Sequence, residues 1–267
     1  MHNIPVITVK GKNIPEAWEK AVIAVWENGI DVRTEYDRDG DPPSKDCTMI
    51  IEVEEPMSEP RIHRAFPGGL EDLEMYRQEV ICGIHDHRIK PEEGKWCYTY
   101  HERLFNYKGR IDQIDYIVRK LSQVAHSRRA QAITWYADVD PTVDDAPCLQ
   151  RAWGRIVGTE TLALNMNTHW RSRDGYKAAF MNMFVMTDLQ KLIAQRISDN
   201  IVHEVRVGRY VDISDSFHIY GSYYDEFRGF LKTVKNRSFE ERTWRTEFAE
   251  PIFEEARERL KAEVSKK

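Results

Sequence analysis

Arginine side chains gather with other hydrogen-bonding groups in three short segments of the chain. HSRRAQAITW carries Arg128 and Arg129, HWRSRDGYKAAFMN carries Arg171, and DISDSFHIYGSYYDEF carries His218 and Tyr220 two residues apart. A guanidinium group can donate two parallel hydrogen bonds to a phosphate dianion. An arginine at the end of a strand can equally be solvated or paired with a surface carboxylate. The density of these groups favours a site for a phosphorylated ligand.

A cysteine lies between two of these segments, in DDAPCLQR. Cys148 follows a proline and precedes large polar side chains, whereas Cys47, Cys82 and Cys97 lie in apolar stretches and are expected to be core thiols. None of the four forms a CxxC pair, which favours free thiols in a reducing cytoplasm. The residue type alone does not assign a role to Cys148.

The order of the motifs does assign one, because it resembles that of the thymidylate synthase family. An Arg-Arg pair precedes a strand that ends in Trp, and Pro-Cys follows about twenty residues later. An Arg-Ser-x-Asp motif comes next, with Asn182 eight residues beyond Asp174, and DSFHIY closes the series. The resemblance extends from about residue 98 to residue 230.

The resemblance implies a covalent mechanism on a pyrimidine nucleoside monophosphate. Cys148 would add to C6 of the ring and make C5 carbanion-like. The family's general acid/base matches Glu79 in YRQEVICG, with a helix-surface glutamate as the alternative. The implied substrate contacts are the 5′-phosphate for Arg171 and Ser172, the pyrimidine O4 and N3 for Asn182, the sugar hydroxyl for His218 and Tyr220, and the base O2 and the folate for Asp174.

Further residues follow from the same resemblance. The Arg128–Arg129 pair would reach the phosphate from a second subunit, which implies an obligate homodimer. YDRDGDPP resembles an early arginine loop and makes Arg38 another phosphate ligand, with Arg33 as a competitor. Tyr100 falls where the family has Tyr-Gly and would line the pocket.

Three departures from the family pattern bear on the reaction. The usual Pro-Cys-His is Pro-Cys-Leu, alanines at 178 and 179 replace a glycine, and the chain ends in ERLKAEVSKK instead of an apolar tail. These changes preserve nucleotide binding and thiol addition in outline, but they leave the outcome at C5 open.

Folate-dependent methylation of dUMP to dTMP, with 5,10-methylenetetrahydrofolate as cosubstrate, is therefore the first hypothesis. The resemblance favours uracil, because a cytosine reader of the deoxycytidylate hydroxymethylase type typically carries Asp where this chain has Asn182. A CMP or dCMP 5-hydroxymethylase with the same thiol chemistry is the alternative. A nucleotide- or RNA-binding protein that has kept the fold without turnover is the third.

Hydrophobic spacing predicts the elements that position these residues. Apolar residues recur at helical intervals and indicate amphipathic or buried helices. Alternating or β-branched runs indicate strands, and GTET (158–161) suggests a hairpin. Helices are expected over 15–29, 69–83, 111–124, 180–197 and 247–264, and strands over 47–56, 130–136, 150–157, 162–170 and 205–214. This mixture predicts an α+β fold, and the resemblance implies helices packed on a mixed, largely antiparallel sheet that forms the dimer interface.

Composition sets the outer limits. The chain has 267 residues, of which 41% are hydrophobic and 31% charged, and its net charge is −5. It therefore lacks the basic field of a DNA-binding protein. No repeat or linker interrupts it, which predicts a single domain over 1–267, and no segment resembles a signal peptide or a membrane span. His85, His87 and His101 lack the thiols or carboxylates of a recognisable metal pattern, so no metal site is predicted.

Overall fold

The computed structural model describes residues 3–264 in two compact units. The first unit contains the chain up to Gly68 together with Trp170–Phe184 and Arg209–Ala249. The second unit contains Gly69–His169, Val185–Gly208 and the chain from Glu250 onward. The long helix α5 (Ala179–Ile201) and strand β9 (Val205–Ile219) each contribute residues to both units.

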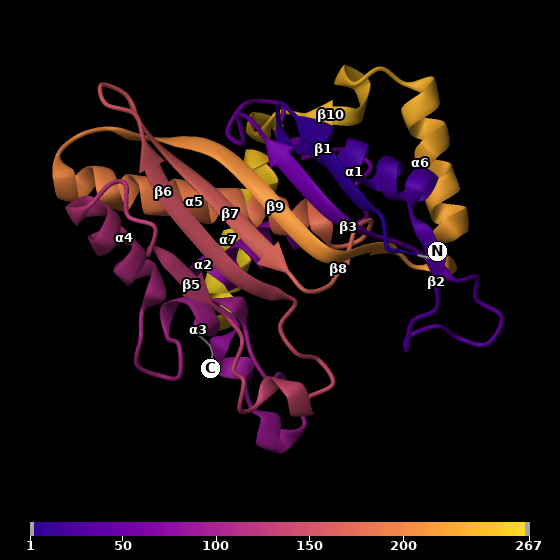
Figure 1. Ribbon diagram of the computed structural model, residues 1–267, viewed down its shortest axis with the longest axis horizontal. Coiled ribbons are helices and arrows are strands. Elements are labelled where there is room, and N and C mark those ends of the chain that lie inside the picture. Colours follow the sequence, from indigo (N-terminus) through magenta and orange to yellow (C-terminus); the bar gives the residue numbers. More distant parts are fainter. Residues whose placement is uncertain (1–2, 265–267) are drawn as a thin grey trace. The chain divides into compact units, whose positions relative to one another are not determined.

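A mixed sheet forms the centre of the first unit (Figure 1). Its strands are β1 (Val6–Gly11), β2 (Ile30–Val32), β3 (Ser44–Val53), β8 (Arg173–Asp174) and the later part of β9. β1 runs parallel to β3 and β8 parallel to β9, whereas β2 and β9 pair with β3 in the antiparallel direction. Outside this sheet lie the short antiparallel pair β4 (Ile62–His63) and β10 (Thr243–Trp244) and the helices α1 (Ile14–Asn28) and α6 (Tyr224–Asn236).

Helix α1 shows how the sequence specifies this unit. The Asn13 side chain caps the helix by accepting the backbone N–H of Glu16, and Pro15 occupies the first turn. Trp18 is fully buried, and its indole N–H donates to the carbonyl of Gly175 at 2.9 Å. A Cβ at Gly175 would lie 2.4 Å from the ring of Phe217, so this approach requires glycine.

The second unit contains the strands β5 (Gln131–Ile133), β6 (Leu149–Val157) and β7 (Leu162–Trp170), whose last residue belongs to the first unit. β6 lies between β5 and β7 in the sheet, as the predicted hairpin requires (Figure 1). Its helices are α2 (Leu70–Cys82), α3 (Tyr100–Phe105), α4 (Gln113–Gln123) and most of α7 (Thr246–Val264). Single 3-10 turns across the two units span Asp86–Arg88, Pro91–Glu93, Asp140–Thr142, Gly221–Tyr223 and Glu240–Arg242.

The predicted elements are confirmed, with shifts of a few residues at their ends. Leu164 and Met166 are buried on β7, while Asn165 and Asn167 alternate with them at half-buried positions. The α+β fold, with helices packed on a mixed sheet, is confirmed as well. The sequence interpretation overlooked β1, β2, α3 and α6.

One expectation about the thiols is wrong. Cys82 is exposed, because it is the last residue of α2 and does not lie on the face that buries Leu73 and Val80. Cys47 is fully buried and Cys97 is half-buried. Within residues 3–264, no helix is long and apolar enough to cross a membrane.

Candidate functional site

The predicted site residues are distributed over the two units. The second unit holds Glu79, Arg128, Arg129 and Cys148. The first unit holds Arg38, Arg171, Ser172, Asp174, Asn182, His218 and Tyr220.

Cys148 is half-buried and directly precedes β6. In its neighbour Leu149, both the backbone N–H and the carbonyl are hydrogen-bonded to side chains. The Leu149 N–H donates to the hydroxyl of Tyr100 at 3.2 Å. The Leu149 carbonyl accepts a hydrogen bond from the Thr134 hydroxyl. Since Leu149 is completely buried, these bonds have no solvent substitute, and they determine where the backbone presents the thiol.

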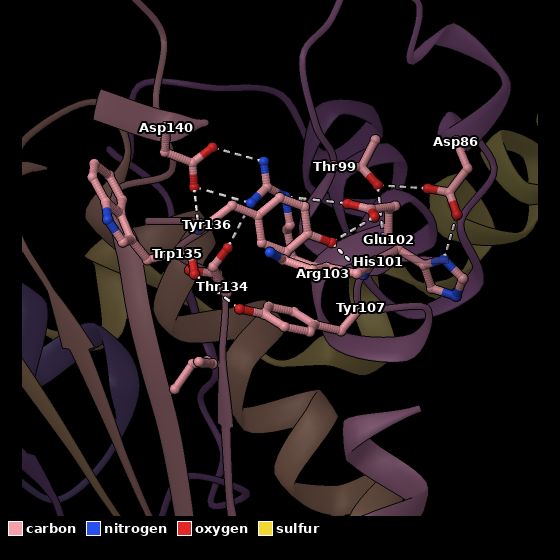
Figure 2. Close-up of polar contacts among 12 residues, drawn as sticks. Asp86, Thr99, His101, Glu102, Arg103, Tyr107, Thr134, Trp135, Tyr136 and Asp140 are labelled. Carbon is pink, nitrogen blue, oxygen red and sulfur yellow. Dashed lines mark hydrogen bonds and ion pairs between the residues drawn. The ribbon is translucent and has the colours of Figure 1, made fainter. Parts of the chain in front are cut away.

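A buried network holds the helix that carries Tyr100 (Figure 2). The Arg103 guanidinium donates to both carboxylate oxygens of Asp140, at 2.9 and 2.8 Å, and to the Thr134 carbonyl at 2.8 Å. It also lies 3.5 Å from the centre of the Tyr136 ring. Paired forks of this kind order both partners more firmly than single contacts do. They attach α3, and with it Tyr100, to the segment after β5.

Glu79 and Tyr100 line the same cavity, whose volume is about 270 Å³. Burial raises the pKa of Tyr98, another lining residue, and the nearby Tyr100, Asp145 and Cys148 raise it further. Tyr98 therefore lies close to Cys148. The complete lining is Tyr76, Glu79, Trp96, Cys97, Tyr98, Thr99, Tyr100 and Asp145. In the second unit, the predicted acid/base Glu79 therefore lines the same aromatic cavity as Tyr98 and Tyr100, the two tyrosines near the predicted nucleophile Cys148.

In the first unit, β8 positions Asp174 beside His218, its register partner on β9. The Asp174 carboxylate accepts the backbone N–H groups of Tyr176 and Lys177 at 3.1 and 2.8 Å. Burial nevertheless raises the pKa of Asp174 to about 6, because desolvation of the charged carboxylate outweighs these hydrogen bonds.

His218 belongs to a buried polar chain across β3 and β9. The Ser216 hydroxyl donates to Asp46 at 2.8 Å and lies 3.2 Å from Nδ1 of His218. Burial lowers the pKa of His218 to about 4 and raises that of Asp46 to about 6. The imidazole is therefore neutral at physiological pH. The Tyr220 ring packs against it with the centroids 4.6 Å apart, so these two predicted sugar ligands do lie together.

Asn182 is buried in the first turn of α5, where its backbone N–H donates to the carbonyl of Ala178. Arg171 and Ser172 are half-buried and follow the end of β7. Arg38 is exposed in the loop after β2. Its competitor Arg33 donates to the Asp41 carbonyl at 2.6 Å, so this guanidinium forms a hydrogen bond within the loop.

Arg128 and Arg129 are exposed at the start of β5. The Arg128 carbonyl accepts the indole N–H of Trp153, and the Arg129 N–H donates to the Ser127 hydroxyl. These backbone contacts anchor the segment, and the action of both side chains across a dimer interface stays a prediction.

The comparisons with known proteins agree with the motif order. Residues 74–252, more than half of the chain, match the protein family described as Thymidylate synthase. The chain belongs to the thymidylate synthase family. It is similar to proteins named "Putative thymidylate synthase" from Methanosarcina mazei and Methanosarcina barkeri, with 28% and 29% identity over 226 residues. Each alignment covers 85% of this chain and 95% of the relative.

The comparison with solved structures shows the fold. The solved structure of thermostable thymidylate synthase A from Bacillus subtilis matches with a TM-score of 0.60 and 21% identity, and the match covers 81% of this chain and 83% of that one. A thymidylate synthase fold in this chain is thereby established.

Three charged residues that hold this thymidylate synthase fold escaped the sequence interpretation. Arg173 pairs with Asp212 at 2.8 and 3.0 Å and donates to the Ala179 carbonyl, joining β8, β9 and the start of α5. Arg103 likewise joins α3 to the segment after β5, through its bonds to Asp140 and to the Thr134 carbonyl. The signal that could have found them is Asp212 itself, which occupies an inward position of an otherwise apolar strand and therefore requires a buried partner.

Within the described part of the chain, no three His, Cys, Asp or Glu side chains are grouped so that they could hold a metal ion. His85 and His101, which the sequence interpretation set beside His87, are instead paired with carboxylates. His85 contacts Glu79 at 2.8 Å and His101 contacts Asp86 at 2.6 Å.

Proposed function

We propose that this member of the family transfers a one-carbon unit from 5,10-methylenetetrahydrofolate to C5 of a pyrimidine nucleoside monophosphate, converting dUMP to dTMP. The observation that carries the proposal is the arrangement in the second unit. Cys148 is presented from a segment fastened to Tyr100, and Tyr100 and Glu79 line one cavity.

The thiolate of Cys148 adds to C6 of the pyrimidine, and the electron pair of the C5–C6 double bond moves toward O4. Addition makes C5 nucleophilic. Glu79 supplies and removes protons at the ring during this addition and its reversal, which is the task of a positioned carboxyl group. The folate supplies the carbon unit and, in a synthase, the hydride that completes the methyl group. The flat rings of Trp96, Tyr98 and Tyr100 in the cavity wall suit a planar ring system.

The first unit supplies the proposed substrate contacts. Arg171 and Ser172 bind the 5′-phosphate, with Arg38 as an additional ligand. Asn182 reads the base, and its burial supports this role, because a buried carboxamide discriminates strongly between donors and acceptors. The neutral imidazole of His218, with Tyr220, binds the sugar hydroxyl, and Asp174 contacts the base O2 and the folate. Arg128 and Arg129 complete the phosphate site from the second subunit of a homodimer.

The second candidate is a CMP or dCMP 5-hydroxymethylase, in which water captures the one-carbon intermediate. The observation that favours it is Leu149, which follows the nucleophile where the family usually has histidine, and whose buried side chain brings no proton donor to the site. Binding without turnover is the third outcome that the same experiment separates.

The deciding experiment incubates the protein with dUMP, UMP, dCMP or CMP and methylenetetrahydrofolate and identifies the products by mass. A methylated uracil nucleotide together with dihydrofolate supports the synthase, and a hydroxymethylated product with tetrahydrofolate supports the second candidate. Cys148→Ser should abolish product while nucleotide binding persists, whereas Cys82→Ser, which alters an exposed thiol at the end of α2, should not. Full activity in Cys148→Ser, or binding with no product from any of the four, would refute the proposal.

A further inference from the structure

Glu79 has a buried imidazole as its partner. Nδ1 of His85 lies 2.8 Å from Oε2 of Glu79, and the two side chains are 6% and 18% exposed. A contact this short and this shielded from water keeps most of its electrostatic strength. His85 is therefore placed to hold the Glu79 carboxylate in one orientation.

The local backbone brings His85 back onto Glu79. Gly83 ends α2 in the left-handed conformation, with φ of 65°, and its N–H donates to the Glu79 carbonyl. This turn reverses the chain, so that the residue after Ile84 packs beside the last turn of the helix. A side chain at position 83 would collide with His101, so the turn requires glycine.

The residue after His85 is anchored as firmly. The Asp86 carboxylate accepts the Thr99 hydroxyl at 2.5 Å and contacts Nδ1 of His101 at 2.6 Å (Figure 2). The ring of Trp96 packs edge-on against His85 at 5.5 Å. The imidazole is thus held by its own segment and by the segment that leads into α3.

His85 also lines a second cavity, of about 210 Å³, whose lining shares no residue with that of the cavity beside Glu79. The charged residues around this second cavity come from α2, the following 3-10 turn and α7: Glu71, Asp72, Arg88 and Arg259. Glu71 and Arg259 form an ion pair at 2.6 Å, and the Asp72 carboxylate accepts the Gly69 N–H. The imidazole of His87 also lies near, with the ring centres 6.4 Å apart. The charges that face His85 are therefore of both signs.

We propose that His85 positions Glu79 and relays protons between that carboxyl group and the water of the second cavity. The proposal rests on Glu79 being the acid/base of the proposed reaction. In the relay, protonated Glu79 passes its proton to Nδ1 of the imidazole, and the proton on Nε2 leaves to water. The carboxylate regains its charge, and the ring ends as the neutral tautomer that donates to it. Atoms and charge balance, and no other reactant is required.

The test compares His85→Gln with His87→Gln, which removes an exposed imidazole two residues away. A glutamine can hold the carboxylate by hydrogen bonding but cannot carry a proton onward. His85→Gln should therefore lower kcat by about 10- to 100-fold, less than the roughly 10²- to 10⁴-fold that a general acid or base itself typically contributes, because Glu79 is still present; KM for the nucleotide should stay unchanged. It should also shift the acidic limb of the pH–rate profile. His87→Gln should leave both the rate and the profile as they are.

A second variant keeps the proposal testable if glutamine disturbs folding. His85→Ala leaves room beside Glu79. Added imidazole should raise the rate of this variant by roughly tenfold or more over its rate without imidazole. An active wild type with an unchanged profile in His85→Gln and no imidazole rescue in His85→Ala would overturn the relay and leave the proposed function intact. A wild type that forms no product from any nucleotide would overturn both.

Discussion

Removing the Tyr100 hydroxyl tests how the fold presents the nucleophile. Tyr100→Phe keeps the ring, which is 9% exposed, and deletes only the acceptor of the Leu149 N–H. Leu149 is completely buried, so its N–H would lose its partner, at a cost of about 1–3 kcal/mol. The segment can avoid this cost only by moving until the N–H meets water, and this movement would carry Cys148 away from its place.

If this whole cost of about 1–3 kcal/mol is added to the activation free energy, the Cys148-dependent rate should decrease by about 5- to 150-fold, since 1.36 kcal/mol corresponds to a factor of ten. Single-turnover product formation measures this rate, and peptide-level alkylation of Cys148 by iodoacetamide reports on the thiol without requiring turnover. The control is Tyr107→Phe, which deletes a hydroxyl that donates to the Trp135 carbonyl at 3.0 Å in the same unit. Equal rates for Tyr100→Phe and the wild type would show that this hydrogen bond does not position the nucleophile.

Two further variants test the first unit. Asn182→Asp should shift preference from uracil to cytosine nucleotides, because a carboxylate accepts from the cytosine amino group but cannot donate to O4; unchanged relative affinities for dUMP and dCMP would contradict the base-reading role. Asp46→Asn should stabilise the protein at pH 8 by about 1–3 kcal/mol, with the gain vanishing toward pH 4 in urea titrations. The sign follows from the pKa of Asp46, which burial raises from 3.8 to about 6, so that the folded state bears the cost of the charged carboxylate once the pH rises through 6. A destabilised Asp46→Asn variant at pH 8 would mean that the carboxylate is compensated by its surroundings.

Local periodicity accounts for the part of the fold that the sequence predicts. Helix α1 could be read from Pro15, Gly29 and apolar residues at helical intervals, and β7 from strict alternation. The same reasoning could not find α3. Its six residues make less than two turns, too few for a periodic pattern, and the helix is stabilised by Arg103, whose partner Asp140 lies 37 residues away.

In the candidate site, too, some residues could be predicted from the sequence, whereas the contacts between distant residues could not. Motif order nominated Cys148 and Glu79, and in the structure Glu79 lines the cavity whose tyrosines lie beside Cys148. The pairing of His85 with Glu79 depends on a left-handed turn at Gly83, and that of Arg173 with Asp212 on the register of β8 and β9. Such contacts leave no spacing signature, since chain reversal and strand register create them.

The covalent bond between Cys148 and the pyrimidine is the central claim, and one mass measurement addresses it. In a 5-fluoropyrimidine nucleotide, the fluorine cannot leave C5 as a proton does, so the adduct formed with the folate should persist. Proteolysis and mass spectrometry should then find the nucleotide and the folate on the peptide that contains Cys148, with none attached in Cys148→Ser. A label on Cys97, which lines the same cavity, or no label at all in a protein that turns over the natural nucleotide, would contradict the account.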